Sequence, residues 1–178
     1  MPISQPDLNA ALLQLTKHYA TAAQKALEDN LVSIALYGFV ARGQAGPAPD
    51  IDIFVVLQEA PSGMLARRRL LQPVRDSLTV ELEALWEQGI YTDFIEVIRS
   101  RTEAQQFHPL YLYMSQEAIL LYDRDRFLIP FSEGSGSVCR ELAQSATSWE
   151  GIGTGIEAGL YAWGGCVKMT CIGFLRKL

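Results

Sequence analysis

The sequence has few cysteines and histidines, and their spacing points to no metal or redox site. The three cysteines, Cys139, Cys166 and Cys171, show no C-x-x-C spacing, so neither a disulfide framework nor a zinc site is indicated. The two histidines, His18 and His108, have no cysteine or acidic neighbour at ligand or triad spacing. We therefore expect free thiols and structural histidines.

The sequence also lacks a long apolar run and an excess of basic residues. No segment approaches the roughly 20 apolar residues of a membrane span, and segment 1–20 has no basic start or apolar stretch typical of a signal peptide. A cytoplasmic location without membrane attachment is expected. The net charge of -5 argues against a broad, non-specific grip on nucleic acid, which depends on Lys and Arg neutralising phosphates. Any nucleotide must be held locally.

What the sequence does contain is enough apolar material for one ordinary domain. Hydrophobic residues make up 49% of the 178 residues and charged residues 20%, a mix typical of soluble globular proteins. We predict a domain over residues 1–130. A glycine-rich C-terminal extension of unknown role follows over residues 131–178.

Strand and helix patterns alternate along the predicted domain. Apolar residues at helical spacing predict helices over residues 6–30, 71–88 and 102–115, the second bent at Pro73 and the third interrupted near Pro109. Short runs of branched and aromatic residues predict strands at Leu31–Tyr37, Asp50–Leu57, Ile90–Ile98 and Ala118–Tyr122. This alternation indicates an α/β or α+β sheet domain.

Two carboxylates lie at the start of the second predicted strand. Because side chains alternate along a strand, Asp50 and Asp52 project from the same face. Adjacent like charges are unfavourable unless a cation lies between them, and hard oxygen ligands suit Mg²⁺ carried with a nucleoside triphosphate. An Asp-x-Asp pair alone is weak evidence, since a solvated turn also explains it.

The turn before these carboxylates strengthens the functional interpretation. Gly38 and Gly43 bound the segment GFVARG, where glycine lets the backbone approach phosphate oxygens closely, and Arg42 adds a positive charge. Each residue alone has a structural explanation, as an ordinary tight turn or a solvated loop charge. The combination of strand, glycine turn, loop and paired carboxylates is harder to explain structurally.

The segment LYGFVARGQAGPAPDIDIFVVL, from Leu36 to Leu57, resembles the nucleotidyltransferase signature of the DNA polymerase β superfamily. The family pattern is a strand, Gly-Ser-x-Ala-Arg-Gly, a loop, and Ser-Asp-x-Asp before an apolar strand. The resemblance is closest to the minimal nucleotidyltransferases, an antitoxin-type group. Weaker similarity extends through HPLYLYMSQEAILLYDRDRFL. The resemblance implies a small mixed β-sheet flanked by helices.

The resemblance also implies roles for individual residues. Gly38, Phe39, Arg42 and Gly43 would form the phosphate-binding turn, while Asp50 and Asp52 would coordinate two divalent ions, Mg²⁺ or Mn²⁺. One position departs from the pattern, because Phe39 stands where the family has serine. The backbone donor remains at that position, but the serine hydroxyl is lost.

The family's third carboxylate lies on a later strand, where Glu96 and Asp93 are the candidates. We favour Glu96 as the third catalytic and metal-binding residue because it lies inside an apolar run, where an unpaired charge would be costly. Asp93 lies nearer the start of the strand and is more easily explained as a solvated end residue. An edge-strand charge facing water remains an equal explanation for Glu96.

The resemblance implies a Mg²⁺-dependent nucleotidyltransferase that transfers a nucleoside monophosphate, AMP from ATP in the first instance, to an acceptor hydroxyl by a two-metal mechanism. A partner toxin protein is the first choice of acceptor. The alternative is a non-catalytic binding module that retains the fold and binds a partner, with Phe39 as a trace of lost chemistry. In an active enzyme, Glu96 should point toward Asp50 and Asp52 in an open pocket, with Phe39 turned away.

Overall fold

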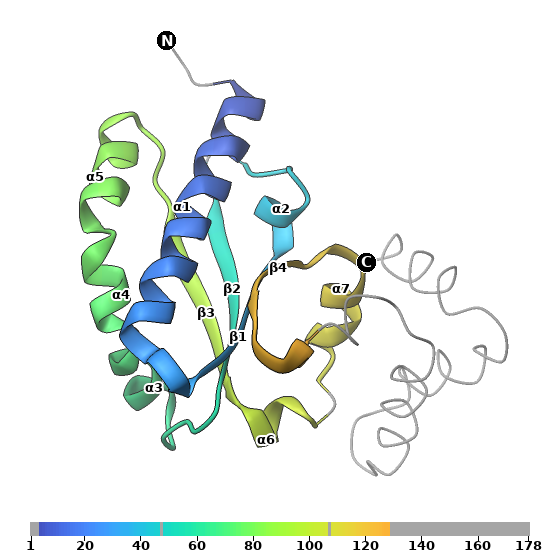
Figure 1. The fold of residues 1–178 in the computed structure, drawn as a ribbon. Coiled ribbons are helices and arrows are strands. Elements are labelled where there is room, and N and C mark those ends of the chain that lie inside the picture. The colour runs from blue at the N-terminus through green and yellow to red at the C-terminus, as the bar shows by residue number, and fades with distance from the viewer. Residues whose placement is uncertain (1–3, 47, 107, 129–178) are drawn as a thin grey trace, which may run out of the picture. The chain divides into compact units, whose positions relative to one another are not determined.

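The computed structural model describes residues 4–46, 48–106 and 108–128, whose elements follow the expected order (Figure 1). They are α1 (Gln5–Leu27), η1 (Glu28–Asn30), β1 (Leu31–Tyr37), α2 (Gly38–Ala41), β2 (Asp50–Leu57), α3 (Met64–Leu70), α4 (Gln72–Ser77), α5 (Thr79–Glu87), β3 (Asp93–Ser100), α6 (Arg101–Ala104), α7 (Leu110–Glu117), β4 (Ile119–Asp123) and η2 (Arg124–Arg126). The predicted boundary at residue 131, the glycine-rich extension and the three cysteines lie outside the described residues. Among the described residues, no helix combines the length and apolar character needed to cross a bilayer.

The strands form a mixed sheet in the order β3-β2-β1-β4. Strand β1 runs antiparallel to both β2 and β4, whereas β2 and β3 run parallel. The parallel pair is joined through α3, α4 and α5, as a parallel connection requires a crossover. The predicted fold class, an α/β domain with a small mixed sheet flanked by helices, is confirmed.

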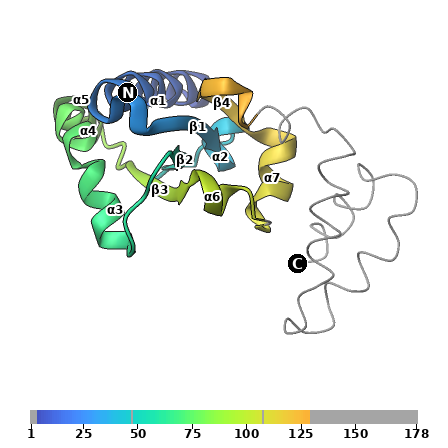
Figure 2. The same cartoon turned by 60° about the horizontal axis from the view of Figure 1, so that its bottom comes forward.

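The two faces of the sheet carry different apolar clusters. One face packs Ile51, Ile53 and Val55 of β2 against α1 and the α4–α5 segment. The other packs Phe54 and Val56 against residues of α6 and α7. Figure 2 shows α1 on one side of the sheet and α6 on the other. By strand alternation, Asp50 and Asp52 lie on the face that α6 and α7 partly cover.

Strands β1 and β2 have the predicted bounds, while some other boundaries differ. The predicted helix over residues 71–88 begins earlier, at Met64, and is divided at Leu71 and Leu78 into α3, α4 and α5. Pro73 lies in the first turn of α4, where its missing N–H costs no hydrogen bond. Strand β3 begins at Asp93 rather than Ile90, because the Ile90 N–H donates to the Leu85 carbonyl of α5 and not to a neighbouring strand.

Candidate active site

Gly38, the first residue of α2, lies directly against Asp52. Gly38 has a φ of +76°, and a Cβ atom at this position would lie 2.2 Å from Asp52 Oδ2. Side chains other than glycine are strained at this φ, and here they would also collide with the carboxylate. The structure therefore brings the predicted glycine turn and the predicted carboxylate pair together.

The pair itself is an uneven one, with Asp50 exposed and Asp52 half-buried. Burial, followed by repulsion from Asp50, raises the pKa of Asp52, and Arg42 opposes these effects. On the neighbouring strand, Tyr37 pairs with Asp52 in the antiparallel register. Burial and then Asp52 raise the pKa of the Tyr37 phenol to about 12, so the phenol stays neutral beside the carboxylates at neutral pH. Tyr37 was not among the predicted site residues.

Arg42, at the end of α2, forms an ion pair with the carboxylate of Glu117. The same Glu117 carboxylate accepts a hydrogen bond from the Gly38 N–H at 3.1 Å. Glu117 also contributes, after burial and Asp50, to the raised pKa of Asp52. A carboxylate of α7 that the sequence did not single out thus contacts the predicted turn.

Phe39, the residue that departs from the family pattern, is exposed and contacts Arg42. The residue is 60% exposed, and the guanidinium of Arg42 lies over its ring at 4.5 Å from the centroid. A cation over an exposed aromatic ring is stabilised by about 0.5–1 kcal/mol. Phe39 therefore stabilises the position of the Arg42 guanidinium.

The loop that follows the turn is held by Asn9 of α1. The Asn9 side-chain amide donates to the Gly43 carbonyl at 2.6 Å, and its oxygen accepts from the Ala45 N–H at 3.3 Å. Gly43 has a φ of +69° and so ends α2 in a conformation that favours glycine. The helix over residues 6–30 gave no signal of this contact, because Asn9 fits its polar face.

Glu96 does not join Asp50 and Asp52, and the expectation that it would point toward them is wrong. In the parallel register Ile53 pairs with Glu96, so Glu96 faces the core beneath α1, opposite to Asp52. There its fully buried carboxylate accepts hydrogen bonds from the Tyr19 hydroxyl at 2.9 Å and from the Arg75 guanidinium. The buried charge of Glu96 is therefore paired, as its apolar surroundings require, but its partner is an arginine of α4 and not a metal ion.

Asp93, the other candidate, lies on the correct face. It pairs with Asp50 in the parallel register, so both side chains project from the same side of the sheet. Its side chain is 59% exposed, and Arg75 Nη1 lies 4.0 Å from its Oδ1 atom. Across residues 4–128 apart from the undescribed positions, no three His, Cys, Asp or Glu side chains lie close enough to hold a metal ion by themselves.

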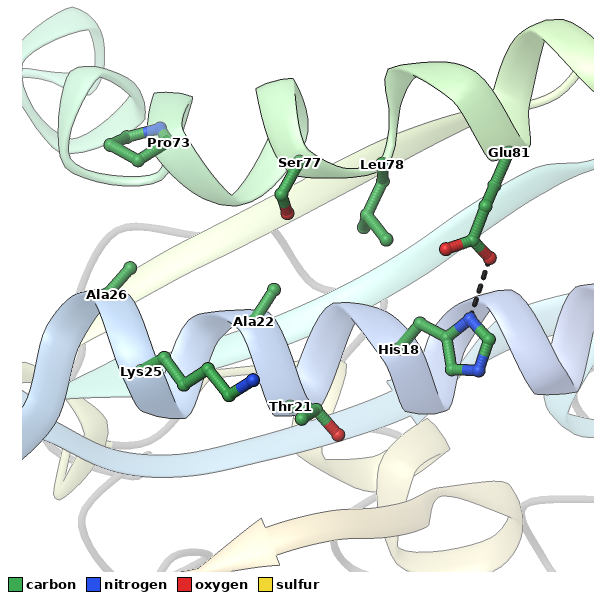
Figure 3. A pocket seen from close by; sticks show the side chains of 9 residues that line it. All are labelled: His18, Thr21, Ala22, Lys25, Ala26, Pro73, Ser77, Leu78 and Glu81. Atoms are coloured by element: carbon green, nitrogen blue, oxygen red, sulfur yellow. Dashed lines mark hydrogen bonds and ion pairs between the residues drawn. The ribbon is translucent and has the colours of Figure 1, made fainter.

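A shallow groove elsewhere does not include these residues. Figure 3 shows it between α1 and the α4–α5 segment, crossed by a 2.7 Å contact between His18 Nδ1 and Glu81 Oε2. These helices cover the face of the sheet opposite to Asp50 and Asp52. The groove is therefore separate from the candidate active site.

Comparison with known proteins matches the family described as nucleotidyltransferase domain to residues 21–115, more than half of the chain. Over 99 residues the chain is 29% identical to a protein of Methanocaldococcus jannaschii whose name provisionally assigns protein adenylyltransferase activity. That alignment covers 56% of this chain and 63% of the relative, so the chain spans less than two thirds of the relative's length.

Two crystal structures of toxin–antitoxin complexes are also similar to this chain. One contains AMP-PNP and is 19% identical, with a TM-score of 0.42 over 72% of this chain and 92% of the other. The second, the MntA–HepT toxin–antitoxin, is 17% identical, with a TM-score of 0.42 over 75% and 92% of the two chains. These likenesses are too distant to add to the site described above.

Proposed function

Because the chain belongs to the nucleotidyltransferase domain family, we propose that it transfers a nucleoside monophosphate from a nucleoside triphosphate to an acceptor hydroxyl. The observation that supports this most directly is the contact between the Gly38 turn and Asp52, with Asp50 on the same face of β2. A turn that can receive phosphates and a carboxylate pair that can receive their cations are the two parts that phosphoryl-group chemistry requires.

The carboxylate pair fits Mg²⁺ or Mn²⁺. Asp50 and Asp52 offer hard oxygen donors, and burial followed by repulsion from Asp50 raises the pKa of Asp52, a repulsion that a cation would relieve. Two carboxylates suffice for Mg²⁺ when substrate phosphates and water supply its other ligands. When bound, the ions would neutralise charge on the phosphates and lower the pKa of the attacking hydroxyl. The chain's own part is to hold the two carboxylates beside the Gly38 turn.

We assign the third carboxylate to Asp93 in place of Glu96. Asp93 stands next to Asp50 on the adjacent strand, and its exposed side chain is accessible to an acceptor hydroxyl. Its role would be to accept the proton of that hydroxyl. Glu96, enclosed by Tyr19 and Arg75, instead stabilises the start of β3 from beneath.

ATP and a protein hydroxyl are the first substrates to test. Protein adenylyl transfer is the activity named for the Methanocaldococcus jannaschii relative, and a partner toxin is the acceptor that the sequence resemblance favours. The net charge of -5 disfavours a nucleic acid acceptor held by its backbone.

The test is to incubate the full chain with each α-labelled nucleoside triphosphate, Mg²⁺ or Mn²⁺, and candidate acceptor proteins. We expect metal-dependent label transfer that Asp50→Asn with Asp52→Asn abolishes. Asp93→Asn should slow transfer by about a hundredfold or more, while Glu96→Gln should lose stability but keep the chemistry. Nucleotide binding without transfer to any acceptor would favour the alternative function, a non-catalytic binding module. Full activity in Asp93→Asn would refute the assignment of Asp93 as the third carboxylate.

A further inference from the structure

The carboxylate of Glu117 occupies two donors of the phosphate turn. It lies at the end of α7, 79 residues from Gly38, accepts the Gly38 N–H at 3.1 Å and forms an ion pair with Arg42. Its side chain is only 15% exposed, so this is an enclosed contact and not a solvated surface pair.

These two donors are the kind that an incoming phosphate would use. A phosphate oxygen and a carboxylate oxygen accept the same charge-assisted hydrogen bonds from a backbone N–H and a guanidinium. Both anions cannot occupy one position, and their like charges repel. Asp52 adds to that repulsion. It lies close enough to Glu117 for Glu117 to contribute to its raised pKa, after the larger contributions of burial and Asp50.

We propose that Glu117 is an internal competitor of the nucleotide: its carboxylate holds the Gly38 N–H and Arg42 until the triphosphate displaces it. The inference rests on the proposed function, because it concerns the same phosphate turn. Phe39, stacked on the guanidinium, keeps Arg42 in place while its anionic partner changes.

Because of this competition, the apparent Kd for nucleotide equals the intrinsic Kd divided by the fraction of molecules in which Glu117 is displaced. If about one molecule in ten has Glu117 displaced, removing the carboxylate tightens nucleotide binding about tenfold. A supporting role would have the opposite effect on nucleotide affinity. If Glu117 positioned Arg42 for the phosphate, removing the Glu117 carboxylate would weaken nucleotide binding.

The experiment compares the parent with Glu117→Gln, which keeps the shape, and Glu117→Ala, which removes the group. Glu87→Gln, at an exposed position on α5, is the control for a change of net charge alone. Calorimetry with Mg²⁺–ATP and, separately, with Mg²⁺–tripolyphosphate measures affinity. We expect both Glu117 variants to bind about tenfold more tightly than the parent, and the control to bind like the parent.

The Gly38 amide resonance, followed by NMR, reports whether Glu117 holds the turn in solution. It should move in both Glu117 variants without ligand and remain in place in the control. An unmoved Gly38 resonance, or equal or weaker binding by the Glu117 variants, would overturn the proposal.

The two phosphate probes separate this inference from the proposed function. If ATP binds none of the proteins while tripolyphosphate binds the Glu117 variants more tightly than the parent, the nucleotide function fails, but competition between Glu117 and phosphate for the turn stands. If neither probe binds any of the proteins, the competition is refuted as well.

Discussion

Replacing Gly38 with alanine should damage the site far more than it damages the fold. An alanine at a φ of +76° costs about 1–2 kcal/mol in backbone strain, which lowers the melting temperature by about 2–8 °C in a chain of this size. The new Cβ would also lie 2.2 Å from Asp52 Oδ2, well inside van der Waals contact. The half-buried carboxylate must therefore shift by about 1 Å or rotate.

A shift of this size matters for chemistry, because a misplacement of about 1 Å at a reacting centre can cost about a hundredfold in rate. We therefore expect Gly38→Ala to lose at least that factor in nucleotidyl transfer. Its metal-dependent nucleotide binding should weaken too, since Asp52 is one of the two proposed cation ligands.

Gly89 provides a matched control. Its φ is +81°, and a Cβ atom there would have no heavy atom within 4 Å. Gly89→Ala should therefore show the same loss of melting temperature with normal transfer and binding. Thermal melting, calorimetry and the labelled transfer assay on both variants separate strain from collision. Equal transfer by the two variants would refute the argument that glycine is required at position 38 for Asp52.

Three other perturbations have defined outcomes. Because burial and Asp50 raise the pKa of Asp52, Asp52→Asn should raise the melting temperature at pH 7. This gain should vanish below about pH 4, where the aspartate is protonated in the unfolded chain as well as in the folded protein. A gain that persisted in a melting series below that pH would contradict the prediction. Arg75→Ala should cost about 3–5 kcal/mol in urea unfolding, because the Glu96 carboxylate stays buried without its cation; a loss below about 1 kcal/mol would argue against that pairing. Phe39→Ser should cost less than about 1 kcal/mol, since the ring is exposed, and should raise transfer about tenfold or more by restoring a hydroxyl donor. A folded Phe39→Ser variant without that gain would mean that the serine hydroxyl is not what limits transfer.

The elements were predictable where a local pattern determines them. The runs Leu31–Tyr37 and Asp50–Leu57 match β1 and β2 because both strands are buried on both faces over most of their length, which produces apolar segments, and because glycine follows the first run and proline precedes the second. The glycine turn and the carboxylate pair were predictable for the same reason, since each is a short motif with its own stereochemistry.

The third carboxylate was mispredicted because the face of a strand depends on its register. Glu96 and Asp93 are separated by an odd number of residues, so only one can share a face of the sheet with Asp50. The apolar neighbours of Glu96 indicated that it is buried, but not on which face of the sheet it lies. Counted from the predicted start at Ile90, Glu96 has the same parity as Asp50 and Asp52, and only the true start at Asp93 gives that parity to Asp93.

The contacts of Asn9 and Glu117 had no local signal at all. Asn9 reaches Gly43 across 34 residues, and Glu117 reaches Gly38 across 79, so both depend on how the helices pack on the sheet. Each residue is unremarkable within its own helix pattern. Their roles follow from tertiary structure alone.

The two hydrogen bonds of Asn9 mean that the first turns of α1 help to hold the loop that follows the phosphate turn. Both ends of one side-chain amide secure the loop at Gly43 and Ala45. Proteolysis or truncation within these first turns would release that loop while the sheet and the rest of α1 remain packed. Damage at the N-terminus should thus first appear as faster hydrogen exchange at Ala45 and weaker nucleotide binding, ahead of any loss of secondary structure.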